Sequence, residues 1–373
     1  MLYFFSSDTH VPFLIPRQNQ GRTQQQETEN DLTKSIKVVF SNLLESKSLP
    51  KRKLDDTDDN TVRLFPPKKR KKWYLGDSGE DSLYVRKCVL DVVSLFSKKL
   101  EKSDSFLWII SGAAGIGKSW SINLFLVELL RLKKKIFFHS GSYGAAWKIE
   151  DGLVKEADPL SIQILEADWI YVYDSPGAKA GLTMSERAVP RTGKGVSLIF
   201  SSPKAENYAF ATSKGGSLPH FFHLPPWERE EMLAVKKGNE TDVAASETEN
   251  AVNACYDIWG GNMRALDGFL KEYKEDPEKA VEEAKEGIAV QISLISKDFA
   301  EKMTDKLQKQ DIQGTFNAGQ AQNSPGHILV PVPSETDIEK SGCFEKFRWR
   351  FCSQMAETKF WEHAKNVGAQ NQS

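Results

Sequence analysis

A glycine-rich turn between an apolar strand and a helix constrains this chain more than any other feature. Residues 106–110 (FLWII) form a short apolar run typical of a buried parallel strand, and apolar residues at helical spacing follow from Trp120. Between them lies a full match to the P-loop pattern G-x-x-x-x-G-K-[ST]. Its residues are Gly112, Ala113, Ala114, Gly115, Ile116, Gly117, Lys118 and Ser119. The pattern predicts a phosphate-binding loop at the start of a helix.

Each part of this loop suits the binding of a nucleoside triphosphate. Glycines let backbone N–H groups close around a phosphate because no Cβ blocks the turn, and the helix N-terminus adds the positive end of its dipole. Lys118 is placed to reach the β- and γ-phosphates, and the Ser119 hydroxyl to bind Mg²⁺. The loop therefore predicts ATP and Mg²⁺ as ligands. A chance match is the alternative, and the flanking strand and helix argue against it.

A second metal ligand is expected at the end of another apolar strand. Residues 169–173 (WIYVY) precede Asp174, whose carboxylate would face the same Mg²⁺ from the carboxyl end of a parallel strand. A plain helix cap is the alternative role for this aspartate. Many ATPases place a second acid next to it, and this chain has Ser175 there. The pattern predicts catalysis of ATP hydrolysis through Lys118 and Asp174, either slowly or with a base from elsewhere.

Four further polar residues are candidates for sensing the phosphates. Ser202 follows the predicted strand 196–200 and would suit the γ-phosphate sensor called sensor 1 in AAA-type ATPases; an ordinary Ser-Ser-Pro turn is the alternative. Arg264 begins a helix after two glycines, and its planar guanidinium suits phosphate as sensor 2 does; a surface arginine is the alternative. Arg187 and Arg191 would suit arginine fingers of a neighbouring copy, which leaves a homo-oligomer open.

Strands alternate with helices through the middle of the chain, and helices dominate after it. This order predicts an α/β fold with a parallel sheet, namely a three-layer αβα P-loop NTPase (AAA/STAND-like) with a C-terminal helical, winged-helix-like region. Besides the P-loop strand, the predicted strands are 135–139, 169–173, 196–200, 221–224 and 327–332. The predicted helices include 84–100, 161–167, one that ends at the Gly260-Gly261 pair, a long charged helix over 276–308 and a final helix over 344–365.

The polar N-terminal part predicts a mostly disordered arm, residues 1–72, around one short helix at 32–44. It contains two basic clusters, Lys51–Lys53 and Lys68–Lys72, and two prolines precede the second. Such blocks are typical of signals read by nuclear import receptors, so the arm predicts such a partner and a nuclear location. A contact with DNA or chromatin and a solvated linker are the alternatives. The other predicted domains are the NTPase at 73–270 and the helical region at 271–373.

The composition narrows the remaining function classes. Lys and Arg total 50 against 51 for Asp and Glu, so overall charge points to neither a nucleic acid nor a membrane. The 4 cysteines are scattered, without a C-x-x-C pair, which favours reduced thiols over metal ligands or disulfides. No apolar stretch approaches the roughly 20 residues that span a bilayer. The N-terminus lacks the basic region of a signal peptide, although it would also suit the remnant of a longer chain.

The order of these motifs resembles the P-loop NTPase module of crinkler effectors and retrotransposon-hot-spot proteins. Beyond the two nucleotide motifs, the resemblance rests on Ser201-Ser202-Pro203 before an aromatic-Lys run, on Pro225-Pro226-Trp227 before acidic residues, and on Trp259-Gly260-Gly261 before Arg264. It covers roughly residues 73–361. It implies an ATPase that acts in the nucleus, and in the host nucleus if the chain is a secreted effector, on DNA or host nuclear proteins. A nucleotide-dependent switch without turnover is the alternative.

The chain departs from this family pattern in three places. Met263 stands where the family usually has proline, so the turn before Arg264 is expected to be looser. Nothing before Gln18 matches the ubiquitin-like translocation region of many crinklers, and the sequence ends near where a nuclease domain would begin. The E-x-K spelling of Glu272-Tyr273-Lys274 lies in a charged helix without a strand, so we reject it as a nuclease site.

Overall fold

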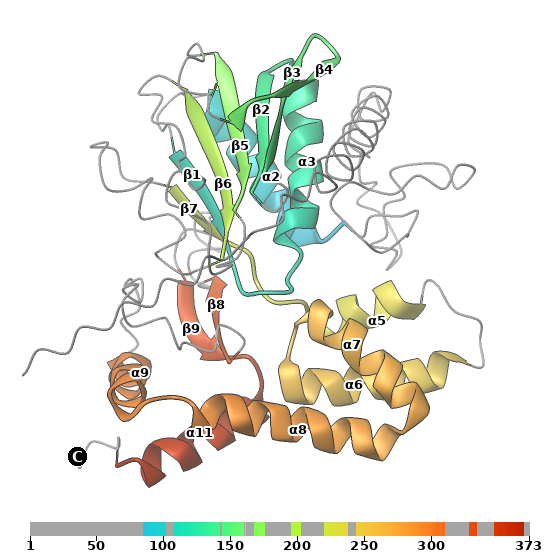
Figure 1. Cartoon of the computed structure of the whole chain (residues 1–373), viewed down its shortest axis with the longest axis vertical. Coiled ribbons are helices and arrows are strands. Elements are labelled where there is room, and N and C mark those ends of the chain that lie inside the picture. Colours follow the sequence, from blue (N-terminus) through green and yellow to red (C-terminus); the bar gives the residue numbers. More distant parts are fainter. Residues whose placement is uncertain are drawn as a thin grey trace, which may run out of the picture.

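A mixed sheet at one end of the molecule and a helical region at the other make up the computed structural model (Figure 1). The structure describes residues 85–101, 107–141, 144–159, 161, 168–175, 195–202, 220–237, 244–309, 328–333 and 347–368. The predicted N-terminal arm, with its helix and both basic clusters, lies outside these residues. Most of the predicted helix 161–167 also lies outside them.

Five parallel strands form the centre of the seven-stranded sheet. In spatial order they are β2 (Lys135–Ser140), β5 (Trp169–Asp174), β6 (Val196–Ser201), β1 (Leu107–Ser111) and β7 (His220–His223). Each is a short apolar run, as expected for strands buried on both faces. The P-loop strand β1 and the Asp174 strand β5 are therefore separated by one strand, β6. All five predicted strands of this region are confirmed to within one residue at each end.

One face of the sheet is covered by α2 (Lys87–Glu101) and α3 (Lys118–Arg131). Phe96 of α2 packs edge-on against Trp108 of β1 and against Phe125 of α3, with ring centroids 5.6 Å apart in both pairs. The opposite face carries a smaller buried cluster that includes Phe137, Tyr171 and Tyr173. This arrangement confirms the predicted α/β fold of a P-loop NTPase. The second helical layer of the predicted sandwich lies outside the described residues.

An antiparallel hairpin extends the sheet beyond β2 and was not predicted. It consists of β3 (Ala145–Glu150) and β4 (Leu153–Ala157), so the sheet is mixed rather than wholly parallel. Asp151 and Gly152 form its turn with φ angles of 49° and 76°. Both values are left-handed, as a tight two-residue hairpin turn requires, and Asp-Gly is a preferred pair there. This dipeptide, with Ile149 before it and Val154 after it in the two strands, was the signal in the sequence that could have revealed the hairpin.

The helical region begins after β7 and contains most of the remaining elements. They are α5 (Arg229–Lys237), α6 (Ala244–Trp259), α7 (Met263–Glu275), α8 (Pro277–Ser293), α9 (Lys297–Lys309), β8 (Leu329–Pro333), β9 (Phe347–Phe351) and α11 (Gln354–Asn366). The core of the sheet continues into α5, α6 and α7 and also includes Ala280 of α8 and Val330 of β8. Most buried apolar residues of α8, α9, α11 and the β8–β9 pair form a second core, which Ile258 of α6 joins. The predicted domain boundaries at residues 73, 270 and 271 stay a prediction.

Two predictions for this region were wrong in detail. The long helix expected over 276–308 is two helices, because the chain breaks at 294–296 and the Ser296 side chain accepts a hydrogen bond from the Phe299 N–H at the start of α9. The helix expected over 344–365 is a strand followed by a helix. Residues 347–351 (FRWRF) alternate between apolar and basic residues, which suits a strand, and β9 pairs antiparallel with β8. Ser353 then caps α11 by accepting from the Ala356 N–H.

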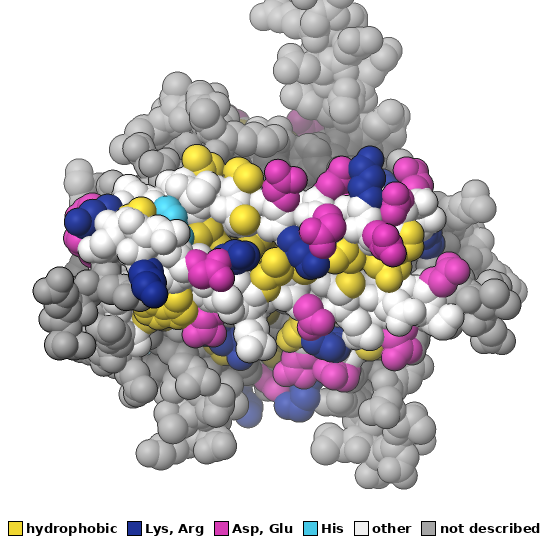
Figure 2. Space-filling view, turned by 90° about the horizontal axis from the view of Figure 1, so that it is seen from below, with side chains coloured by type: hydrophobic (Ala, Val, Ile, Leu, Met, Phe, Trp, Pro, Cys, Tyr) yellow, Lys and Arg dark blue, Asp and Glu magenta, His cyan; other side chains and the backbone are white. Residues whose placement is uncertain are grey.

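The end of the helical region away from the sheet presents a mixed surface. Figure 2 shows acidic and basic side chains interspersed there, with hydrophobic side chains between them. Val290 and Leu294 are among the exposed apolar residues of this region. The described residues on this face form no continuous basic patch of the kind that binds the phosphates of nucleic acids. Among the described helices, none has both the length and the apolar character needed to cross a membrane.

Glu128 is a buried charge whose contribution to stability should depend on pH. It accepts hydrogen bonds from the Arg131 guanidinium at 2.6 and 2.7 Å and from Ser97 Oγ at 2.6 Å. Its pKa is lowered chiefly by the bonds from Arg131, against the opposing effect of burial, with a further lowering by Ser97. Because the folded-state pKa is below the unfolded value, this stabilisation is present above the unfolded pKa and is lost as the pH falls through the folded pKa.

We expect Glu128→Gln to lower the free energy of unfolding at pH 7 by about 1–2 kcal/mol, since an amide replaces a charged acceptor. The difference from the wild type should shrink as the pH is lowered below about 4. Chemical denaturation at several pH values measures both effects. Glu286→Gln, at an exposed position of α8, is the matched control. A difference that stays constant down to pH 3 would contradict the assignment.

Candidate functional site

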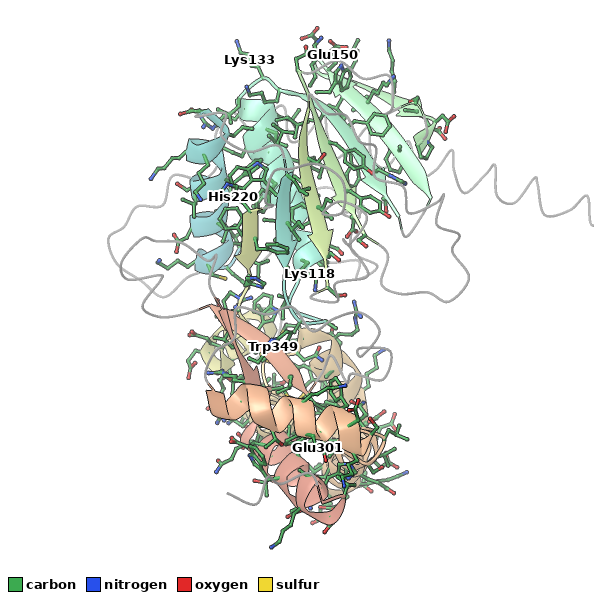
Figure 3. All side chains as sticks on the ribbon, turned by 90° about the vertical axis from the view of Figure 1, so that its left-hand side faces the viewer. Lys118, Lys133, Glu150, His220, Glu301 and Trp349 are labelled. Carbon is green, nitrogen blue, oxygen red and sulfur yellow. The ribbon has the colours of Figure 1, made fainter. Side chains whose placement is uncertain are left out.

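The carboxyl ends of the five parallel strands meet at the edge of the sheet that faces the helical region. Figure 3 shows Lys118 at this edge, between the sheet and the β8–β9 pair. The strand register brings the last residues together: Ser140 pairs with Asp174, and Ser111 pairs with both Ser201 and His223. In a doubly wound sheet, ligands bind at this edge, close to a point where the order of the strands reverses.

The P-loop leaves β1 at Gly112 and leads directly into α3. Gly117 occupies the N-cap position of α3 with φ 89°, a left-handed conformation that favours glycine, and provides no side-chain cap. The first N–H groups of α3 therefore lack a side-chain acceptor from the cap position, where helices commonly have one. The Lys118 Nζ donates to the carbonyl oxygens of Gly112 and Ala113 at 2.7 and 2.6 Å, so the ammonium group is held over the loop. A helix N-terminus next to an ammonium group is an arrangement that can bind an anion.

Two residues that lie 55 positions apart in the sequence form a hydrogen bond at this site. The Ser119 Oγ donates to Asp174 Oδ1 at 3.1 Å. Asp174 is the last residue of β5 and is 6% exposed. Burial raises the pKa of its carboxyl group to about 6, although the bond from Ser119 and the charge of Lys118 both act to lower it. The structure thus brings together both residues predicted to bind the metal.

Positive charge at the loop is unfavourable without an anion. The pKa of Lys118 is lowered to about 7, first by burial and then by the nearby charge of Arg264, against an opposing effect of Asp174. Lys118 and Arg264 both lie close to the P-loop, and an anionic ligand would reduce the repulsion between these two cations. This arrangement of charges suits an anionic ligand.

The start of α7 lies directly on the P-loop. We define the helical lid as the three helices α5, α6 and α7. A Cβ on Gly115 would overlap Asn262 Oδ1 and would lie 3.3 Å from the Cβ of Arg264. Asn262 also caps α7, since its side chain accepts from the Ala265 N–H at 3.2 Å. The predicted sensor residue Arg264 therefore lies beside the loop, and Arg264 itself is exposed. Asn262 is a contact that sequence reasoning did not assign to the site.

The tip of β6 carries the other predicted sensor. Ser202 follows directly after the last residue of the strand, Ser201, whose hydroxyl donates to the Ser202 carbonyl at 3.1 Å. The Ser202 side chain is partly exposed at the same edge as Asp174. Of the other predicted residues, Arg187 and Arg191 lie outside the described part of the chain. The structure thus gathers the P-loop, Ser119, Asp174, Ser202 and Arg264 at one edge, and their roles stay predictions.

A buried serine next to Asp174 was also missed by sequence reasoning. Ser140, the last residue of β2, is the register partner of Asp174, so both side chains leave the sheet on the same face. Its hydroxyl is fully buried and has no hydrogen-bond partner among the residues that the structure describes. The Gly141 N–H donates to the Asp174 carbonyl at 2.9 Å and locks the two strand ends together. A serine at the end of a predicted strand was the only signal in the sequence.

The residues present fit a magnesium ion bound together with phosphate. Mg²⁺ prefers oxygen ligands and usually takes one or two from the protein, with water and substrate phosphates completing its shell. The Ser119 hydroxyl and the Asp174 carboxylate are such a pair. Within the described ranges, no group of three or more His, Cys, Asp and Glu residues could hold a metal ion on its own. The donor set therefore suits a metal that arrives with a nucleotide.

Comparisons with known proteins give only distant structural likenesses. No protein family matches the sequence, and no curated protein matches it. Among solved structures, the RuvB Holliday junction branch migration motor of Thermotoga maritima is similar at 15% identity and a TM-score of 0.30, over 62% of this chain and 79% of RuvB. A chain from the structure of Drosophila ORC bound to DNA is similar at 11% identity and a TM-score of 0.34, over 96% of each chain. At these scores neither likeness places the chain in a family.

Proposed function

We propose that this chain is a P-loop NTPase that binds ATP with Mg²⁺ at the 112–119 loop and hydrolyses it. The observation that carries this proposal is the hydrogen bond between Ser119 Oγ and Asp174 Oδ1 at 3.1 Å. It joins the end of the P-loop to the carboxylate at the end of β5, across the intervening strand β6. Phosphoryl transfer in P-loop proteins needs this pair next to the phosphates.

Each residue of the site has a stated role in the proposal. The N–H groups of the loop and of the first turn of α3 bind the β-phosphate, and Lys118 leaves the carbonyl groups of Gly112 and Ala113 for the β- and γ-phosphates. Ser119 and Asp174 would hold Mg²⁺. When bound, this ion neutralises charge that develops on the phosphate oxygens. Arg264 approaches the γ-phosphate from the helical lid, and Ser202 orients it or the attacking water from the tip of β6.

Activation of the attacking water is the weakest part of the site. Ser175 follows Asp174 in place of the second acid of many ATPases, and its backbone N–H donates to the Phe200 carbonyl. This observation favours a second candidate function, a nucleotide-dependent switch that binds ATP with little or no turnover. Phosphate release under saturating ATP and Mg²⁺, measured with and without DNA, separates the two functions.

Calorimetric titration of the full chain with ATP, with and without Mg²⁺, tests the nucleotide binding on which both candidate functions depend. We expect saturable binding with one site per chain, and tighter binding of ATP when Mg²⁺ is present. Absence of ATP binding under both conditions would refute both the ATPase and the switch.

A nuclear location and a relation to crinkler-type effectors are supported by the sequence. The support consists of the two basic clusters of the arm and of the motif order between residues 73 and 361. The partners that follow from this proposal are a nuclear import receptor, DNA or chromatin, and nuclear proteins, which are those of a host if the chain is secreted. Finger arginines at 187 and 191 would make the active form a homo-oligomer.

Replacing Lys68, Lys69, Arg70, Lys71 and Lys72 by alanine should move a fluorescent fusion of the full chain from the nucleus to the cytoplasm. The reason is that import receptors bind extended chains of Lys and Arg. Replacing Lys51–Lys53 as well should strengthen the effect. Alanine at Lys133 and Lys134, two exposed basic residues outside the arm, is the control. Strong nuclear accumulation of the combined variant would show that the clusters have another function.

A further inference from the structure

Trp227 connects three parts of the molecule that are far apart in the sequence. It lies between the end of β7 and the start of α5, where the chain passes from the sheet to the helical lid. Its side chain is largely buried, with 8% exposed. Around it lie the P-loop, the turn before α7 and the residue that precedes α2. A buried aromatic residue at such a junction restricts how the parts can move relative to one another.

On the lid side, the backbone of Trp227 fixes the turn that begins α7. The Trp227 N–H donates to the Gly261 carbonyl at 3.1 Å. A Cβ on Gly261 would overlap the backbone oxygen and nitrogen of Trp227, so the two backbones are in direct contact. Asn262 and Arg264 follow this turn immediately, so the backbone of Trp227 lies against the turn from which both of them start.

On the P-loop side, the indole ring lies against the start of α3. Its Cζ2 atom is 3.6 Å from the position that a Cβ on Gly117 would occupy. Asn262 and Arg264 contact the same loop at Gly115. The tryptophan and the start of α7 therefore lie close to the P-loop at two glycines that are only two residues apart. A shift of the lid would move these contacts together.

Arg86 packs on the Trp227 ring and stabilises the segment before it. Its guanidinium lies 4.5 Å from the centre of the Trp227 ring, and it donates to the carbonyl oxygens of Pro225 and Pro226 at 2.8 and 2.7 Å. It also pairs with Glu231 of α5 at 2.8 Å. Arg86 itself is only 3% exposed. The guanidinium donates to these carbonyl groups and its charge is paired with Glu231. Arg86 therefore stabilises the position of the Trp227 ring and is not available to bind a ligand.

We propose that Trp227 is a positioning residue that seats the helical lid on the P-loop and thereby sets the approach of Arg264 to the nucleotide phosphates. This inference rests on the proposed nucleotide site and adds a residue that acts on it through the lid. Trp227 touches the loop and the lid, and its effect on ATP is transmitted through Arg264. Its removal should therefore weaken ATP binding mainly by removing the contribution of Arg264.

A double-mutant cycle on ATP affinity tests this mechanism. The variants are Trp227→Ala, Arg264→Ala and the double variant, each titrated with ATP and Mg²⁺ by calorimetry. We expect each single substitution to weaken binding about fivefold to tenfold, and the double variant to bind about as weakly as Arg264→Ala alone, since coupled residues are not additive. Trp361→Ala, whose ring packs with Phe351 and Phe360 in the second core, is the matched control. It should leave ATP affinity unchanged.

The outcomes separate this inference from the proposed function. If the wild type binds no ATP, the nucleotide site itself is refuted. If the wild type binds ATP but Trp227→Ala binds equally well, or if the losses of the two single variants multiply in the double variant, the positioning role is refuted. Circular dichroism and thermal melting show whether each variant folds. Should Trp227→Ala not fold, Trp227→Phe replaces it in the same cycle, with a smaller expected loss and the same requirement of non-additivity.

Discussion

Replacing Lys118 by alanine is expected to weaken ATP binding by at least about tenfold, or about 1.4 kcal/mol. The ammonium group donates hydrogen bonds to two loop carbonyl groups and lies close to Asp174 and Arg264. The substitution removes the cation that the loop directs at the β- and γ-phosphates, while β1 and α3 keep their packing. Calorimetric titration with ATP measures the loss.

Lys134→Ala is a suitable control for this variant, because that lysine is exposed just beyond the other end of α3. It should bind ATP as the wild type does. Equal affinity of the wild type and Lys118→Ala would remove the P-loop as the nucleotide site, whatever else binds the ligand.

Replacing Asp174 by asparagine is expected to spare most of the nucleotide affinity and to reduce turnover by about a hundredfold or more. Asparagine keeps an oxygen that can accept the bond from Ser119, but it removes the negative charge that would orient Mg²⁺. Phosphate release at saturating ATP and Mg²⁺ measures the effect, and titration with ATP alone shows whether binding is kept.

Asp168→Asn is the matched control for this variant. Asp168 directly precedes β5, whereas Asp174 is the last residue of that strand. Asp168 forms an exposed ion pair with Lys135. Turnover by this control should equal that of the wild type. Turnover by Asp174→Asn equal to that of the wild type would contradict the metal role. If the wild type itself shows no turnover above background, the switch is the better proposal, and Ser175 offers its physical reason.

The parts of the fold that the sequence predicted well are those determined by local periodicity. Short apolar runs bounded by turns became the five parallel strands, and the P-loop pattern placed its glycines at the start of α3. The predictions were wrong where a short-range signal was overlooked or overridden. The Asp151-Gly152 turn was overlooked, and residues 347–351 form a strand because β8 is there to pair with them.

By itself, the sequence determined which residues are candidates for binding phosphate, because a P-loop and an aspartate at the end of an apolar strand are local patterns. Only the tertiary structure decided which residues meet. The pairing of β5 with β6, and of β6 with β1, brings Asp174 to Ser119, and the docking of α7 brings Asn262 and Arg264 to Gly115. The position of Trp227 between Arg86, Gly117 and Gly261 also depends on packing between segments that are distant in the sequence. No local pattern encodes such packing.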